Sequence, residues 1–132
     1  MGTGYKGDSK YYRSVGQNIM IAKSKYNYKD GYFGEKSPST GSRTRNIASD
    51  DPRATAVDFY NKIAFGGKED TFQDGKLKIT RMADGTVITW RETSHSDGTS
   101  VIDINIDDST HTGGVKKQKI HFVEAKLMKV KK

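Results

Sequence analysis

Apolar and polar residues alternate in three stretches in the second half of the chain, residues 86–92, 100–106 and 117–123. Successive side chains of a β-strand point to opposite faces, so each stretch predicts a strand with one apolar and one polar face. This alternation is typical of an antiparallel sheet that packs one face and exposes the other. The predicted apolar face consists of Ile88, Trp90, Ile102, Ile104, Ile106, Ile120 and Phe122.

The segment before these strands has the signals of a helix. Asp51 is a good N-cap, Pro52 suits the first turn, and Gly66 and Gly67 end the segment. The spacing of three and four residues between its apolar positions predicts one stripe that packs on the sheet. The stripe consists of Ala56, Val57, Tyr60, Ile63 and Ala64.

A further strand is predicted at residues 76–82, after a loop at residues 68–70. A two-residue turn at Asp84 and Gly85 then leads into the first central strand. We therefore predict an α+β domain over residues 50–132, in which an N-terminal helix packs on a four-stranded antiparallel β-sheet.

Residues 1–49 are poor in aliphatic side chains and rich in Tyr, Gly, Ser and Lys. Spacing predicts a short helix over residues 9–22, and Asp30-Gly31 between aromatic residues predicts a hairpin. Residues 34–42 are typical of a linker. We predict a basic linker or entry segment that is at best partly ordered; the alternative is an arm that stacks on bases and touches phosphates.

Composition and charge exclude some kinds of site and favour one class of binding partner. The chain has 132 residues, no cysteine and a formal net charge of +7. Disulfides and thiolate metal sites are therefore excluded, and no apolar run approaches the ~20 residues of a membrane span. A basic chain is attracted to polyanions, which favours nucleic acid as a partner.

The polar face of the predicted sheet gathers groups that can bind and cleave a phosphodiester. The imidazole of His121 suits proton transfer near neutral pH, while Arg91 offers a planar fork to phosphate oxygens. Asp103 could orient His121 or Arg91, or act as a base; orientation ranks first because neighbouring cations weaken a carboxylate as a base. The alternative for Arg91 is a cross-strand salt bridge to Asp103. The whole set is Thr89, Arg91, Asp103, Asn105, Lys119 and His121.

The polar loop at residues 92–98 adds candidates. Thr93, Ser94 and Ser96 could bond phosphate oxygens or merely build the turn. His95 is a candidate second acid–base group, because only one histidine lies on the central polar face.

A loose divalent-cation site is conceivable at His111 with Asp107 and Asp108, but no recognised metal-ligand spacing supports it. We therefore expect no metal and no cofactor. A metal-free site favours RNA, which carries its own nucleophile, the 2′-OH.

Three parts of the chain carry a resemblance to a known family. These are Lys68, then DGTVITWRETSHSDGTSVIDINI at residues 84–106, and KKQKIHF at residues 116–122. The series resembles the C-terminal nuclease toxin domains of bacterial polymorphic toxins, of the contact-dependent inhibition and LXG types. Trp90 stands where the family pattern has Tyr, and His95 is an addition within the Ser-rich loop.

The resemblance implies a ribonuclease with the fold shared by barnase and the tRNA-cleaving colicins, with Lys68 among the substrate-binding residues. It also implies a cognate immunity protein, delivery as the C-terminal part of a larger secreted toxin, and action in the target-cell cytoplasm. We expect metal-independent cleavage of RNA, and the resemblance implies that the RNA is tRNA. A host activator protein is a further candidate partner. The alternatives are a metal-dependent toxin DNase and a non-catalytic RNA- or protein-binding module.

Overall fold

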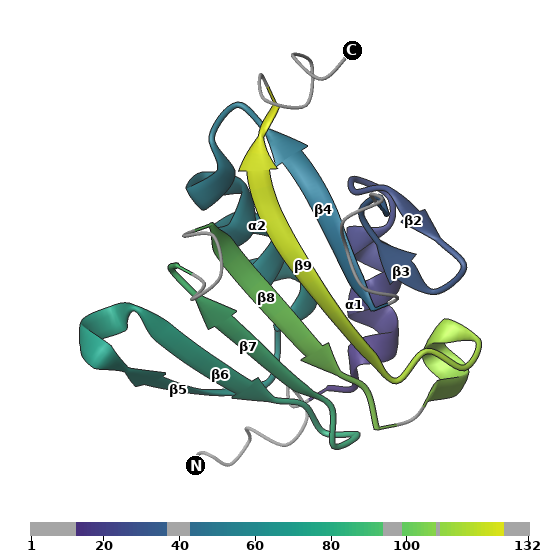
Figure 1. Cartoon of the computed structure of the whole chain (residues 1–132). Coiled ribbons are helices and arrows are strands. Elements are labelled where there is room, and N and C mark those ends of the chain that lie inside the picture. The colour runs from purple at the N-terminus through teal and green to yellow at the C-terminus, as the bar shows by residue number, and fades with distance from the viewer. Residues whose placement is uncertain (1–12, 37–42, 94–98, 108, 126–132) are drawn as a thin grey trace.

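A six-stranded mixed β-sheet carries two helices on one of its faces (Figure 1). The computed structural model describes residues 13–36, 43–93, 99–107 and 109–125. The strand order in the sheet is β4-β9-β8-β7-β6-β5. The elements in chain order are α1 (Val15–Ala22), β2 (Tyr28–Lys29), β3 (Tyr32–Phe33), β4 (Thr44–Ser49), α2 (Pro52–Ile63), β5 (Lys68–Phe72), the 3₁₀ turn η2 (Gln73–Gly75), β6 (Leu77–Arg81), β7 (Val87–Arg91), β8 (Ser100–Asn105), the 3₁₀ turn η3 (Ser109–Thr112) and β9 (Lys117–Glu124).

The predicted antiparallel meander is confirmed in strands β6 to β9. Each of the seven apolar residues predicted to face the core is at most 5 % exposed. The general α+β class is therefore confirmed, and the period-two alternation assigned the faces of these strands correctly. No helix within the described ranges is long and apolar enough to cross a membrane.

The predicted sheet of four antiparallel strands is wrong in strand number and in direction. The first residues of strand β5, 68–70, were predicted as a loop. The strand instead pairs antiparallel with β6 at one edge of the sheet. Strand β4, from the predicted linker, pairs parallel with β9 at the other edge, so that Thr44 lies opposite Lys119 and Ser49 opposite Glu124. Both added strands are short and polar, as edge strands commonly are, and therefore lacked an alternating signal.

The connection between β6 and β7 also differs from its prediction. The Met82 amide donates to the Thr86 carbonyl oxygen at 2.8 Å, so Ala83, Asp84 and Gly85 form a three-residue loop rather than a two-residue one. Gly85 has φ +90°. A glycine in this left-handed conformation is the ordinary third residue of such a hairpin loop.

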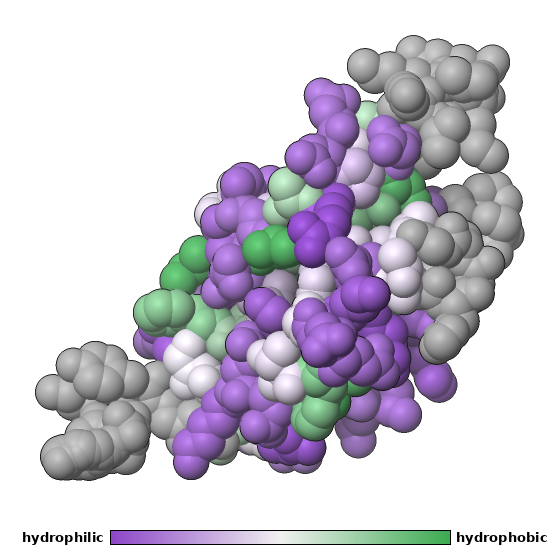
Figure 2. Space-filling model, turned by 90° about the vertical axis from the view of Figure 1, so that its left-hand side faces the viewer, coloured by the Kyte–Doolittle hydropathy of each residue, from purple (hydrophilic) through white to green (hydrophobic). Residues whose placement is uncertain are grey.

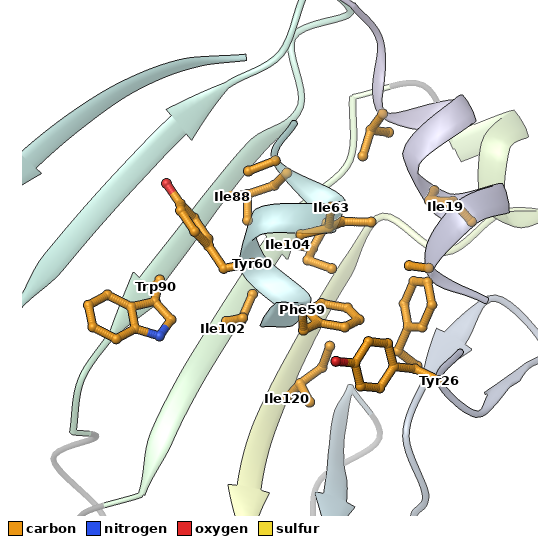
Figure 3. Close-up of a cluster of buried hydrophobic side chains, with 14 of the residues drawn as sticks. Ile19, Tyr26, Phe59, Tyr60, Ile63, Ile88, Trp90, Ile102, Ile104 and Ile120 are labelled. Carbon is orange, nitrogen blue, oxygen red and sulfur yellow. The ribbon is translucent and has the colours of Figure 1, made fainter. Parts of the chain in front are cut away.

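Helix α2 packs on the inner face of the sheet (Figure 3). It begins at Pro52, as predicted. The Asp51 side chain accepts a hydrogen bond from the Ala54 amide at 3.2 Å, which satisfies one free N–H of the first turn. Phe59, absent from the predicted stripe, is fully buried. Its ring contacts three other aromatic rings, with centroid distances of 5.2 Å to Tyr26, 5.0 Å to Phe33 and 5.9 Å to Phe122.

The part of the chain before residue 50 joins the same core. Helix α1 packs against α2, and its buried Asn18 amide donates to the carbonyl oxygens of Ile63 and Phe65 at 2.9 and 2.8 Å. The β2–β3 hairpin turns at Asp30 and Gly31, as predicted. The predicted boundary at residue 50 thus falls between β4 and α2, and both sides contribute to one hydrophobic core. Residues 1–12 and 37–42 lie outside the described residues.

Candidate active site

The sheet face opposite α2, here called the outer face, carries the predicted site residues of strands β7, β8 and β9. Strand pairing places side chains in rows across this face, because residues that pair across strands point to the same side. One row joins Thr89, Asp103, Lys119 and Thr44. The next row joins Arg91, Val101, His121 and Asn46.

A shallow cavity of about 390 Å³ lies on the outer face at strands β7, β8 and β9. Among the described residues, four cationic side chains and one carboxylate line it. The ion pairs formed within the described residues lie elsewhere, so none of these four cations is neutralised by an ion pair with a described residue. A surface with this charge excess attracts a phosphate group. The polar lining on the outer face is Arg43, Arg91, Lys117, Lys119, Asp103, Thr89 and Asn105.

Arg91 and Asp103 line this cavity together, but the described residues contain no ion pair between them. The register explains this arrangement. Arg91 lies opposite Val101, whereas Asp103 lies opposite Thr89 on β7 and Lys119 on β9. The two charged groups are therefore diagonal neighbours, and the guanidinium can serve an external anion.

His121 lies next to this cavity rather than in it. Its side chain is only 8 % exposed, and its neighbour Val101 is fully buried. The hydroxyl of Thr99 lies 2.8 Å from Nδ1 of His121. Thr99 can therefore orient the imidazole ring, whereas the sequence offered Asp103 as a residue that orients His121 or Arg91. Val101 separates His121 from Arg91 in the same row, so their Cα atoms lie about 10 Å apart.

The remaining predicted residues are distributed differently. Thr93 is exposed and lines a separate cavity of about 670 Å³, at the strand ends beside the start of α2. Lys68 is on the outer face, but at the end of β5 away from Arg91, and it does not line the cationic cavity. Ser94, His95 and Ser96 lie outside the described residues.

The loose cation site considered at residues 107–111 is only partly described. Asp108 lies outside the described residues, and nothing is described of the His111 side chain. Elsewhere in the described ranges, no group of three or more His, Asp or Glu side chains is placed to hold a metal ion.

Sequence reasoning missed three contributors to this region. Lys117 shares the outer face with Lys119, and the period-two spacing could have identified it. Arg43 reaches the cavity because the Lys119 amide donates to its carbonyl oxygen at 2.8 Å, a contact that depends on the unpredicted β4–β9 pairing. Thr99 reaches His121 across strands, for which no local signal exists.

A second polar cluster surrounds Asp58, beside a cavity of about 570 Å³ between the β2–β3 hairpin, β4 and α2. Asp58 accepts hydrogen bonds from Lys62 Nζ at 2.8 Å, Lys25 Nζ at 3.0 Å and the Tyr26 hydroxyl. Hydrogen bonds from Lys62, Tyr26 and Lys25 hold the pKa of Asp58 well below its usual range. Burial, followed by the bond to Asp58, raises the pKa of Tyr26. With three donors already bound, this carboxylate ties α2 to the N-terminal segment, and we assign it a structural role.

None of the protein-family models, curated proteins or solved structures compared with the chain matches it.

Proposed function

We propose that the chain is a metal-independent endoribonuclease of the toxin type, which binds RNA on the outer face of the sheet. The observation that carries the proposal is the cavity with four cations and one carboxylate, beside a histidine whose ring is held by a hydroxyl. Cations bind and stabilise the phosphate, and an imidazole transfers protons near neutral pH. RNA supplies the third requirement, its own 2′-OH nucleophile.

In the proposed reaction the 2′ oxygen attacks the adjacent phosphorus and the bond from phosphorus to the 5′ oxygen breaks. His121 takes the 2′ proton or delivers a proton to the departing 5′ oxygen. The second proton transfer falls to His95, which lies outside the described residues. The products are a 2′,3′-cyclic phosphate and a 5′-hydroxyl end.

Arg91 and Lys119 stabilise the negative charge that builds up on the phosphate. The guanidinium can bind two phosphate oxygens through its planar fork, while the ammonium acts as a point charge. Asp103 lies opposite Lys119 in the sheet register and is proposed to position that side chain. Thr89 and Asn105 line the same cavity and can donate further hydrogen bonds to the RNA.

The resemblance of residues 84–106 and 116–122 to polymorphic toxin nucleases supports the same proposal. On this basis tRNA is the proposed substrate, and a cognate immunity protein is the proposed inhibitor. The proposal includes delivery as the C-terminal part of a larger toxin, action in the target-cell cytoplasm, and a host activator as a candidate partner.

The test is incubation of the purified chain with total RNA and, separately, with plasmid DNA, each with and without EDTA. We expect discrete tRNA fragments that are resistant to EDTA, and intact DNA. His121→Gln and Arg91→Ala should each slow cleavage by about 100-fold or more. Because His121 is buried, thermal unfolding of each variant must show that it still folds.

Lys29→Ala is the matched control for Arg91→Ala, because each variant removes one positive charge. Lys29 is exposed on the β2–β3 hairpin, away from the proposed site. DNA nicking that needs a metal ion would replace this proposal with a metal-dependent DNase. Intact RNA and DNA, together with RNA binding, would favour the non-catalytic binding module. Full activity of both site variants would contradict the assignment of the site.

A further inference from the structure

We propose that Phe72 is a stacking platform for an unpaired RNA base, placed beside the cationic cavity. This inference rests on the proposed function, because it assumes that the outer face binds RNA. It deepens that function by naming the class of substrate, a single-stranded or looped segment.

Phe72 lies at the end of the row that contains Arg91. Pairing places Phe72 opposite Leu77, and Leu77 opposite Arg91, so all three side chains are on the outer face. Phe72 is 45 % exposed although it is a large apolar residue. Leu77 and, in the neighbouring row, Ile79 are half-buried and extend this apolar surface. Phe72 thus contributes an exposed aromatic ring to a sheet face whose centre is cationic.

The distance between these groups suits a nucleotide. Two strand spacings separate the Cα atoms of Phe72 and Arg91, which is about 10 Å. A nucleotide carries an apolar base at one end and an anionic phosphate at the other, so both groups can be engaged together. Proteins that bind single strands combine a positively charged groove with aromatic side chains on which bases stack. In a duplex the base faces are already stacked, so an unpaired base is the expected occupant.

The turn that follows Phe72 supports the role of a fixed platform. Gln73 and Asp74 have φ values of +54° and +56°, a left-handed conformation that is uncommon for residues other than glycine. Positive φ at successive residues is the ordinary geometry of a tight hairpin turn, which here joins β5 to β6 and fixes the end of β5 that carries Phe72. The Glu92 amide donates to the Lys76 carbonyl oxygen at 2.9 Å and extends the pairing of β6 with β7 up to this turn.

Charge complementarity favours a polyanion such as RNA as the occupant. The outer face near the cavity has four cations against one carboxylate, and Arg91 borders the apolar surface directly. Figure 2 looks onto the side of the molecule that bears β5 and β6, and it shows small hydrophobic patches within a mostly hydrophilic surface. A patch of this kind fits a single base better than a large apolar protein interface.

The test measures binding of RNA that cannot be cleaved, so that stacking is separated from catalysis. The probe is a fluorescein-labelled 2′-O-methyl decaadenosine, whose 2′ oxygen cannot attack, and its matched partner is an abasic strand of the same length and charge. Fluorescence anisotropy at one fixed salt concentration gives both affinities. We expect Phe72→Ala to weaken binding of the base-bearing strand by about tenfold and to leave the abasic strand unaffected. Phe72→Trp should retain the wild-type affinity.

Phe65→Ala is the control, because Phe65 is also an exposed phenylalanine, 62 % exposed, and follows the end of α2. It should bind both strands as the wild type does. The stacking role would be overturned if Phe72→Ala bound the base-bearing strand as tightly as the wild type, or if it lost the same affinity for both strands. Either result is also the one expected if this surface binds a protein instead of RNA. If the wild type binds neither strand, the stacking role and the proposed function fail together. If Phe72→Ala weakens binding of the base-bearing strand alone, but the wild type leaves unmodified RNA intact, the stacking role is supported and the ribonuclease proposal fails.

Discussion

The hydroxyl oxygen of Thr99 lies 2.8 Å from Nδ1 of His121 and links the entry of β8 to the middle of β9. A histidine held at Nδ1 keeps one ring orientation, and the hydrogen bond at one ring nitrogen influences which tautomer forms. In the proposed reaction Thr99 is therefore a positioning residue that acts through His121.

Thr99→Val keeps the branched shape of the side chain and removes the hydroxyl. We expect the single-turnover cleavage rate to fall by up to about tenfold, the worth of one hydrogen bond. The pH–rate profile should also be displaced, and Thr99→Ser should restore both. The control is Thr71→Val, a change of the same kind at an exposed position of β5. A wild-type rate and profile for Thr99→Val would show that the contact has no part in activity.

Lys117 lines the cationic cavity without having been predicted from the sequence. In the proposed function it contributes to RNA binding through its positive charge. Lys117→Ala should weaken binding of the 2′-O-methyl strand. It should also reduce the slope of log affinity against log salt by about 0.7, the value for one phosphate contact on a single strand. Anisotropy titrations at several salt concentrations measure this slope. Lys29→Ala should leave it unchanged, and an unchanged slope for Lys117→Ala would place Lys117 outside the RNA contact.

Phe59 is the centre of the aromatic contacts in the core, where α2 meets the N-terminal hairpin and β9. Phe59→Ala should lower the free energy of unfolding by about 3–5 kcal/mol through lost burial and a cavity. Urea denaturation measures the change. Phe65→Ala should cost less than about 1 kcal/mol, since the ring of Phe65 is 62 % exposed and its cation–π contact with Arg13 at 5.3 Å is weak. If Phe59→Ala unfolds the domain outright, Phe59→Leu gives the measurable version with a smaller loss.

Asp58 should make the stability of the fold depend on pH in acid. Hydrogen bonds from Lys62, Tyr26 and Lys25 lower its pKa in the folded state. The pKa of an aspartate in the unfolded chain is about 4. Between these two values the unfolded chain binds more protons, so stability is complete above about pH 4 and falls as pH drops toward the folded pKa. The melting temperature of Asp58→Asn should therefore fall less steeply with acid than that of the wild type.

Thermal unfolding followed by circular dichroism between neutral and acid pH checks this expectation. Asp70→Asn is the control, because the ion pair that Asp70 forms with Arg81 at 3.4 Å is exposed. Parallel melting curves for wild type and Asp58→Asn across this pH range would show that Asp58 does not provide the acid dependence.

Much of the fold was predictable from local patterns. The alternation around Ile88, Ile104 and Ile120 identified three strands and their buried faces, because an apolar face must be removed from water wherever the strand is placed. Asp51 and Pro52 marked the start of α2, since capping and the first helical turn depend on neighbouring backbone groups. The same alternation put Arg91, Asp103, Lys119 and His121 on one face of the sheet.

Only the tertiary structure decided which of these residues meet. The charged strand β5 and the polar strand β4 have little apolar surface of their own, and pairing with β6 and β9 provides their backbone hydrogen bonds. The parallel contact with β9 brings Arg43 to the cavity, and the β8–β9 register leaves His121 beside Val101 and Thr99. Local sequence determines the face on which a side chain lies, because that depends on the backbone period. Its neighbours across strands depend on register and strand order, which arise from contacts between residues that are distant in the chain.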